Sequence, residues 1–291
     1  MIEVNNLSYR YSNEPSPAVD GISFKVQKGE IFGFLGPSGA GKSTTQKVLI
    51  RLLRDYKGSA RIAGREISSL NSDFYNMIGV GFELPNHYPR LTALENLRFF
   101  ASFYGGSTAD PMELLRITGL DKDYGRKTDG FSKGMKMRLN FVRALIHDPG
   151  LLFLDEPTSG LDPLNARKIK NIIKDLRNRG KTVFLTTHNM HDADELCDRV
   201  AFITRGRIAL TDTPASLKLQ YGTRKLKIGY GEKQPLTAEF PLDTLADNEQ
   251  FLSIIRTEHI RSMHTSEATL EDIFIKTTGD SLHQSPNSPN N

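Results

Sequence analysis

Alternating apolar and polar residues mark the first elements of the chain. Residues 2–11 and 21–27 alternate in this way, as half-buried strands do, and a turn that contains Pro and Ser lies between them. We expect these two strands to form an antiparallel β layer. Three later stretches, 31–35, 151–154 and 182–186, are rich in consecutive apolar residues. Such runs are typical of strands that are buried on both faces, so they predict the centre of a mostly parallel sheet.

Helical periodicity follows the first of these runs and returns later in the chain. One apolar stripe lies after residue 41, and a second lies on a stretch that Gly180 closes. The two stripes consist of Val48, Leu49, Leu52 and Leu53, and of Ile169, Ile172, Ile173 and Leu176. Between them, residues 84–148 carry mainly helical signals, including Thr92 and Glu95 at the spacing of a capping box. We therefore predict an α/β core that is interrupted by a helical subdomain at about 84–148.

The pattern changes near residue 215. Four stretches beyond it have regular periodicity: 225–230 and 260–265 resemble strands, and 245–256 and 268–276 resemble helices. We predict a main domain at 1–215, followed by a small α+β appendage at 216–279. Residues 280–291 are mostly Ser, Pro and Asn with few apolar side chains, so we expect a disordered tail.

Composition narrows the class of protein. The 291 residues carry a formal net charge of +4, and the basic residues are scattered, so we expect a solvated surface and no nucleic-acid partner. Cys197 is the single cysteine, which excludes an intramolecular disulfide and fits a reducing compartment. No apolar stretch approaches the ~20 residues that cross a bilayer, and the chain does not begin with a signal peptide. We expect a cytoplasmic chain, with any membrane spanned by another protein.

A glycine-rich loop supplies the first chemical signal. It reads G-x-x-x-x-G-K-S and comprises Gly36, Pro37, Ser38, Gly39, Ala40, Gly41, Lys42 and Ser43, with Thr44 directly after it. In such a phosphate-binding loop the backbone N–H groups surround nucleotide phosphates, the lysine reaches the β and γ phosphates, and the serine hydroxyl binds Mg²⁺. The alternative is a chance glycine-rich turn. The intact spacing, the preceding apolar strand and the following helical stripe favour nucleotide binding.

Two carboxylates supply the second signal. The apolar run 151–154 ends in Asp155 and Glu156, which places both acids at the carboxyl end of a predicted parallel strand, where α/β folds bind ligands. Asp155 is suited to hold Mg²⁺, and Glu156 is suited to act as the general base on the attacking water. A surface acidic turn is the alternative, but the phosphate-binding loop in the same chain makes it the weaker interpretation.

In this order, the motifs of residues 1–215 resemble the nucleotide-binding subunit of ATP-binding cassette (ABC) transporters. The resemblance implies that Tyr11 stacks on adenine, although packing between strands is an alternative role for it. It also implies that His188, after the strand at 182–186, is the switch histidine that binds the γ-phosphate and takes part in hydrolysis. Asp162, in the sequence Ser-Gly-Leu-Asp, corresponds to the loop with which two such subunits contact each other.

Two regions of the chain, the signature with Lys133 and Met135 and the position of Glu83, depart from the family pattern. The resemblance implies that Ser132, Lys133 and Gly134 form the signature that contacts the ATP of the opposite subunit, but the family usually has Gly where this chain has Lys133. Ser132 can cap the following helix, whose N–H groups then face the phosphate. Glu83 replaces a family glutamine that binds Mg²⁺ beside the segment touching the membrane partner. A carboxylate keeps the oxygen ligand and adds a negative charge, and it resembles the residue of drug and peptide-antibiotic exporters.

The sequence therefore predicts an α/β P-loop NTPase core with a mostly parallel sheet, an antiparallel β layer and a helical insert. The resemblance implies an ATPase with ATP and Mg²⁺ as cofactors. It also implies a homodimer at the cytoplasmic side of the cell membrane that drives a separate permease and exports a drug, peptide or lipid. One alternative is a soluble ABC ATPase that acts on ribosomes or DNA, but the chain has one cassette and no sustained heptads. A nucleotide-gated regulator with little turnover is the second alternative: Glu156 argues against it, whereas Glu83 and Lys133 leave it open.

Overall fold

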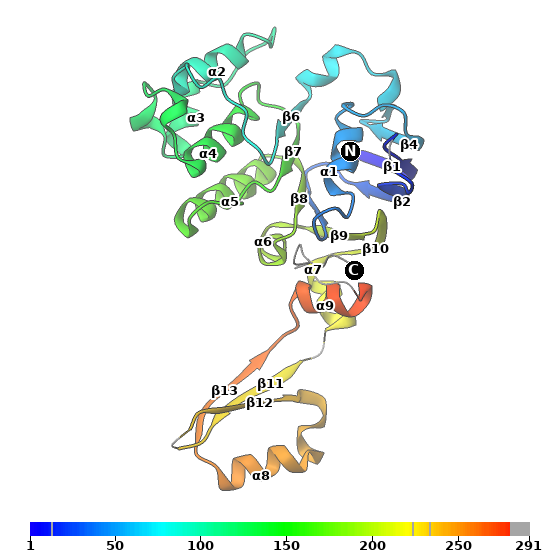
Figure 1. Ribbon diagram of the computed structural model, residues 1–291, viewed down its shortest axis with the longest axis vertical. Helices are drawn as coiled ribbons and strands as arrows, with labels where there is room; N and C mark the ends of the chain where they lie inside the picture. Colours follow the sequence, from blue (N-terminus) through cyan, green and yellow to red (C-terminus); the bar gives the residue numbers. More distant parts are fainter. Residues whose placement is uncertain (13, 223, 233, 280–291) are drawn as a thin grey trace, which may run out of the picture. The chain divides into compact units, whose positions relative to one another are not determined.

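The computed structural model describes residues 1–12, 14–222, 224–232 and 234–279. The chain divides into two compact units, and the division falls after Thr211, close to the predicted boundary at residue 215. Figure 1 shows the elements of each unit. The predicted disordered tail at 280–291 lies outside the described residues.

A six-stranded sheet forms the centre of the first unit, with the order β10-β9-β3-β8-β7-β6. Its strands are β3 (Ile31–Leu35), β6 (Ile78–Gly81), β7 (Leu151–Asp155), β8 (Thr182–Thr187), β9 (Arg199–Thr204) and β10 (Arg207–Asp212). The five strands from β9 to β6 pair in parallel. All residues of β3, β7 and β8 are buried, which is why these strands are mostly apolar up to the polar residues at the carboxyl ends of β7 and β8. Their carboxyl ends lie side by side and carry the candidate site.

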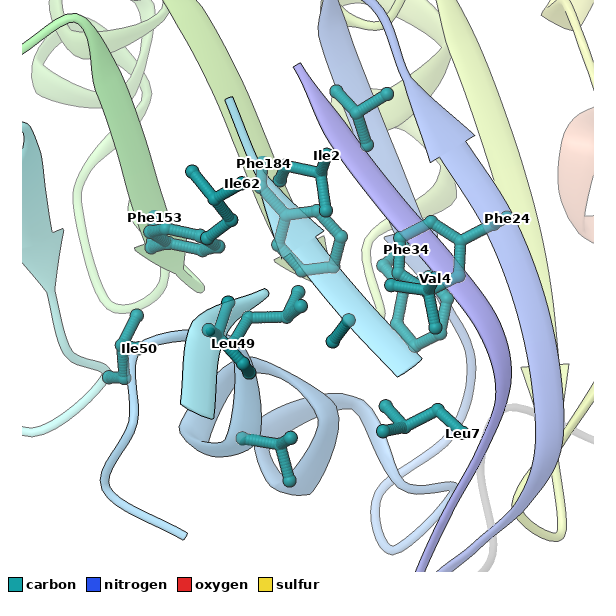
Figure 2. Close-up of a cluster of buried hydrophobic side chains, with 14 of the residues drawn as sticks. Ile2, Val4, Leu7, Phe24, Phe34, Leu49, Ile50, Ile62, Phe153 and Phe184 are labelled. Atoms are coloured by element: carbon teal, nitrogen blue, oxygen red, sulfur yellow. The ribbon is translucent and has the colours of Figure 1, made fainter. Parts of the chain in front are cut away.

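A second, antiparallel sheet has the order β2-β1-β4-β5. It consists of β1 (Ile2–Tyr9), β2 (Val19–Val26), β4 (Lys57–Ile62) and β5 (Arg65–Glu66). One core joins the two sheets, and Figure 2 shows Phe24 and Ile2 of the antiparallel sheet facing Phe34 and Phe184 of the parallel one. The ring centroids of Phe24 and Phe34 lie 5.3 Å apart, and those of Phe34 and Phe184 lie 5.5 Å apart. This aromatic packing fixes β3 and β8 beneath the phosphate-binding loop.

Helices complete the first unit, and those of the insert gather in a separate group (Figure 1). The core helices are α1 (Lys42–Leu49), α5 (Pro163–Asn178) and α6 (Met190–Leu196), and the insert holds α2 (Ala93–Ala101), α3 (Pro111–Ile117) and α4 (Lys133–Arg143). Short 3₁₀ helices lie at Ile67–Ser69, Ser72–Asn76, Asp121–Asp123 and Thr128–Gly130. The predicted capping box is present, because Thr92 accepts from the Glu95 backbone and Glu95 accepts from the Thr92 backbone.

The second unit combines a three-stranded antiparallel sheet, of order β12-β11-β13, with helices. Its elements are α7 (Pro214–Tyr221), β11 (Lys225–Tyr230), β12 (Leu236–Pro241), a 3₁₀ helix (Leu242–Asp247), α8 (Glu249–Thr257), β13 (Ile260–Ser266) and α9 (Leu270–Thr278). The predicted helix at 245–256 starts later, because the Asn248 side chain accepts from Phe251 N and so caps α8 at Glu249. Strand β12, in which Phe240 is the one buried residue, was not predicted from the sequence pattern.

Candidate active site

The phosphate-binding loop connects β3 to α1 and needs its glycines for packing and for backbone geometry. A Cβ on Gly36 would lie 2.0 Å from the carbonyl oxygen of Ile203, and a Cβ on Gly41 would lie 2.6 Å from that of Ala18. Gly41 also has a φ of 108°, which L side chains rarely adopt. The loop is therefore pressed against the neighbouring backbone, and this contact fixes its shape.

Lys42 is buried at the start of α1. Its Nζ donates to the carbonyl oxygens of Gly36, at 2.6 Å, and Pro37, at 2.9 Å. Burial lowers the pKa of Lys42, whereas the negative charges of Glu156, Asp155 and Glu83 act to raise it. The loop thus holds the ammonium group at the phosphate-binding position, facing the acids of the site.

Asp155 ends β7 beside α1. Its Oδ2 accepts from Ser43 Oγ at 3.2 Å, and its Oδ1 accepts from the hydroxyl of Thr186 on β8. The Thr186 hydroxyl also lies 3.2 Å from Gln46 Oε1. No group of three or more His, Cys, Asp or Glu residues in the described chain could hold a metal ion by itself. A serine hydroxyl and one carboxylate, with Glu83 nearby, fit Mg²⁺, which takes few protein ligands and shares phosphate oxygens.

Glu156 follows Asp155 in an unusual backbone conformation, with a φ of 49°. Glu156 is 6% exposed, and its carboxylate accepts three hydrogen bonds. The donors are Thr187 Oγ1 at 2.9 Å, His188 N at 2.8 Å and, with a proton on Nδ1, the His188 ring at 2.6 Å. These contacts aim the carboxylate at the end of β8. The His188 side chain is 48% exposed, and its Nε2 has no hydrogen-bond partner among the described residues, so this atom is available to a ligand.

One cavity of about 270 Å³ brings these groups together. Its lining consists of Ser38, Gly39, Gly41, Lys42, Ser43, Thr44, Glu83, Asp155, Glu156 and His188. Residues from the phosphate-binding loop, the end of β7, the end of β8 and the segment after β6 thus meet at one place. Acids of a kind that can bind metal and activate water face a loop of the phosphate-binding type, which is the arrangement that phosphoryl transfer to water requires.

Tyr11 lies beside this cavity and does not line it. Its hydroxyl is 3.3 Å from the hydroxyl of Thr44, and its ring meets the ring of Tyr9 edge to face, with centroids 5.0 Å apart. This position at the edge of the phosphate-binding loop is compatible with stacking on adenine and with packing between strands.

The signature residues lie outside the cavity. Ser132 caps α4, because its hydroxyl accepts from Met135 N at 3.2 Å. The Lys133 side chain lies over Gly160, where a Cβ would be 3.0 Å from Lys133 Cε and 3.3 Å from its Nζ. Next to it, a Cβ on Gly134 would be 3.5 Å from Leu161. The signature and the Ser159–Asp162 loop therefore contact each other within one chain.

Asp162 has a structural role that the sequence analysis did not consider. Its carboxylate caps α5 by accepting from Asn165 N at 3.0 Å and from Asn165 Nδ2 at 2.6 Å. These hydrogen bonds from Asn165 lower the pKa of Asp162. The position of the Ser159–Asp162 loop is thus tied to the start of α5.

Sequence reasoning missed two features of the site. Thr186 and Thr187 donate hydrogen bonds to Asp155 and Glu156. The only signal for this role in the sequence was the pair of adjacent hydroxyl side chains at the end of an apolar strand. A cavity of about 490 Å³, here called the aromatic groove, was also missed. It is lined by Tyr75, Ile78, Val80, Phe82, Asn86, His87, Tyr88, Phe100, Tyr104, Arg143 and Ala144.

The aromatic groove contains one partly buried cation, Arg143. The Arg143 guanidinium lies 4.6 Å from the centroid of the Phe100 ring and donates to Asn86 O at 2.5 Å. His87 Nε2 lies 2.9 Å from Lys136 O, and burial is the main cause that lowers the pKa of His87 to about 4. The nearby charges of Arg143 and Lys136 act in the same direction. Aromatic side chains recur between residues 99 and 104 of the sequence, and this was the available signal.

Comparison with known proteins agrees with this geometry. The family described as "ABC transporter" matches residues 19–159, and the "Fluoroquinolone efflux ABC transporter C-terminal domain" matches residues 224–267. A fluoroquinolones export ATP-binding protein of Mycobacterium tuberculosis (strain ATCC 25618 / H37Rv) is 56% identical over 284 residues, which cover 97% of this chain and 94% of the relative. The chain belongs to the ABC transporter ATP-binding proteins. A Nod factor export ATP-binding protein I of Burkholderia pseudomallei (strain K96243) is 35% identical, covering 96% of this ABC ATPase and 97% of the relative.

Solved structures match the cassette. The dimeric, post-hydrolysis state of an ATP-binding cassette with bound ADP and Pi is 27% identical, with a TM-score of 0.68, over 73% of this chain and 98% of that one. The predicted P-loop NTPase fold is confirmed. The chain is an ATP-hydrolysing subunit of an ABC transporter and works with a membrane partner. Among the helices that the structure describes, none has the length and apolar character to span a bilayer.

Proposed function

We propose that this ABC ATPase binds MgATP in the 270 Å³ cavity and hydrolyses it with Glu156 as the general base. The observation that carries the proposal is the position of the Glu156 carboxylate. Thr187 and His188 hold it at the end of β8, in the same cavity as Lys42. A fixed carboxylate near a bound γ-phosphate can orient a water molecule and accept its proton.

The other residues bind and position the substrate. Lys42 and the backbone N–H groups of its loop hold the phosphates, and Ser43 and Asp155 hold Mg²⁺, with Glu83 as a further oxygen ligand. The metal, when bound, neutralises phosphate charge. His188 turns its Nε2 toward the γ-phosphate, and Tyr11 contacts the adenine from its place beside Thr44. Catalysis then rests on positioning and on charge stabilisation.

Two copies of the chain form the complete site. We assign Ser132, Lys133 and Gly134 of one copy to the γ-phosphate in the other, and Asp162 to the contact between the copies. Dimeric cassettes among the related solved structures support this arrangement. The exposure of Ser132 and Lys133 supports it too, because groups that meet a partner must be accessible in the single chain.

The homodimer drives a separate permease at the cytoplasmic face of the membrane. The aromatic groove is our candidate for the docking surface, because Phe82 in its wall directly precedes Glu83 of the nucleotide cavity. The relatives named for fluoroquinolone export, together with the matching C-terminal domain, support export of an amphipathic drug. We assign residues 1–215 to catalysis and 216–279 to an appendage outside the catalytic core.

ATPase measurements on the purified chain test the proposal. The parent protein should hydrolyse MgATP, and reconstitution with the permease should raise the rate. His188→Ala should lose most of the turnover while it still binds ATP. If the parent protein binds MgATP but does not hydrolyse it with or without the permease, the nucleotide-gated regulator becomes the correct function.

A further inference from the structure

A buried charge network lies directly behind the candidate active site. Its centre is Asp192 on α6, which is 7% exposed, and its cation is Lys170 on α5, which is 9% exposed. The Lys170 Nζ lies 3.1 Å from Asp192 Oδ1 and also donates to the carboxylate of Glu195. These two hydrogen bonds hold α5 and α6 together.

The second oxygen of Asp192 connects to the two catalytic loops. It accepts from the Thr158 hydroxyl at 2.7 Å and from Asn189 Nδ2 at 3.3 Å, while Asn189 Oδ1 accepts from Asp192 N at 3.0 Å. Thr158 lies two residues after Glu156, and Asn189 directly follows His188. One carboxylate therefore binds both the segment after the base and the segment after the switch histidine.

Further hydrogen bonds close this arrangement into a ring. Asn189 N donates to Thr187 Oγ1 at 2.9 Å, and the same hydroxyl donates to Glu156 Oε2 at 2.9 Å. From Glu156 the chain returns to Thr158, whose hydroxyl binds Asp192. Any displacement of Asp192 thus changes the relative position of the Glu156 carboxylate and the residues that orient it.

The burial of the network argues for a positioning role. Removing a lysine and an aspartate from water is costly, so a buried ion pair is weak evidence for stability by itself. Such a pair does fix the geometry of the elements that it joins, and a displacement of ~1 Å in a catalytic group can cost about 10²-fold in rate. The neighbouring Lys174–Glu195 pair, at 2.8 Å, lies on the surface, and within the described part of the chain Lys174 makes no hydrogen bond to either catalytic loop.

We propose that Asp192, held by Lys170, is a positioning residue for ATP hydrolysis. Through Thr158 and Asn189 it sets the geometry of the Glu156–His188 pair. The inference rests on the proposed function, since it assumes that Glu156 and His188 act on ATP. It adds that Asp192 and Lys170, which lie outside the nucleotide cavity, set the rate at which Glu156 and His188 hydrolyse ATP.

Hydroxyl and charge variants of the full-length chain test this role. Thr158→Val and Asp192→Asn should each lower kcat by about 10- to 100-fold, while ATP affinity stays within about twofold of the parent. Thr158→Ser keeps the hydroxyl and should keep kcat close to the parent. The double variant, Thr158→Val with Asp192→Asn, should lose much less than the product of the two single losses, because both changes break the same contact.

Controls separate this role from a merely structural one. Lys174→Met removes a nearby ion pair without touching the catalytic loops and should leave kcat at the parent value. If Asp192→Asn does not fold, Thr158→Val and Thr158→Ser decide the question. A parent-like kcat in Thr158→Val would overturn the proposal, and so would a loss that appears equally in ATP affinity and melting temperature. Failure of the proposed function has a different signature, because Glu156→Gln would then hydrolyse ATP at the parent rate.

Discussion

Two residues joined by one peptide bond line two different cavities, the aromatic groove and the nucleotide cavity. Phe82 lines the groove, and Glu83, the next residue, lines the nucleotide cavity. The first cavity is built from backbone N–H groups, a lysine and three carboxylates, whereas the second is built from aromatic rings and one partly buried guanidinium. The two cavities therefore differ in the type of side chain that lines them, although consecutive residues of the chain contribute to both.

The two cavities also hold their polar groups differently. In the nucleotide cavity, Asp155 and Glu156 each accept hydrogen bonds from the end of β8. In the groove, the buried Nδ1 of His87 has no hydrogen-bond partner among the described residues. The first region fixes its carboxylates by hydrogen bonds, whereas burial in the second disfavours the protonated form of His87. Changes to each should therefore affect different measurements.

Glu156→Gln should give the largest effect. The amide keeps the shape of the side chain but cannot accept a proton from water, so turnover should fall by about 10²- to 10⁴-fold with ATP affinity retained. ATP turnover and size-exclusion chromatography in MgATP are the measurements, and the variant should accumulate as an ATP-bound dimer. Turnover at the parent rate would remove Glu156 from the mechanism.

Lys42→Ala should abolish nucleotide-dependent dimerisation and hydrolysis. The ammonium group binds the carbonyl oxygens of its own loop, so its removal takes away the charge for phosphate without removing a core side chain. The melting temperature without ATP should stay almost unchanged, and calorimetric titration with MgATP should detect little binding. A variant that unfolds without nucleotide would instead identify Lys42 as a structural residue.

Acid should destabilise the groove through His87. Its pKa is about 4 in the folded chain and near 6.5 when unfolded, so the unfolded chain binds the proton first as the pH falls. This contribution to the free energy of unfolding is complete above pH 6.5 and is lost between pH 6.5 and 4, by up to about 3 kcal/mol. Denaturation curves of the parent and His87→Gln at pH 7.5 and 5 should show the smaller pH dependence in the variant. Equal slopes would mean that other groups, such as His147, carry the acid sensitivity.

Substitutions of Glu83 should have the smallest effect and test the junction between the cavities. Glu83→Gln keeps an oxygen for Mg²⁺ and should keep substantial activity, whereas Glu83→Ala removes that oxygen and should lower hydrolysis or permease stimulation by about tenfold. ATPase rates at several Mg²⁺ concentrations, with and without the permease, provide the comparison. Identical behaviour of all three proteins would make Glu83 a bystander in the loop.

Much of the candidate site could be predicted because its signals are local. The phosphate-binding loop requires particular residues within a few positions, since the same short segment must curl, expose N–H groups and start a helix. The position of Asp155 and Glu156 after an apolar run, and of His188 after another, follows from the rule that parallel strands end at one edge. The helical periodicity around Leu252 was also predicted, but the start of that helix at Glu249 depends on the cap that Asn248 provides.

The sequence by itself determined the cassette, the order of its motifs and the candidate groups for binding and hydrolysing ATP. Only the tertiary structure decided what holds them: Thr187 on Glu156, Asp192 between two catalytic loops, and Lys133 over Gly160. The aromatic groove likewise required the structure. These contacts join residues that are far apart in the chain. Hydrogen bonds and ring contacts between such distant residues leave no periodicity and no fixed spacing in the sequence. Local geometry is encoded by neighbours, whereas the alignment of distant side chains is set by the packing of the sheet and its helices.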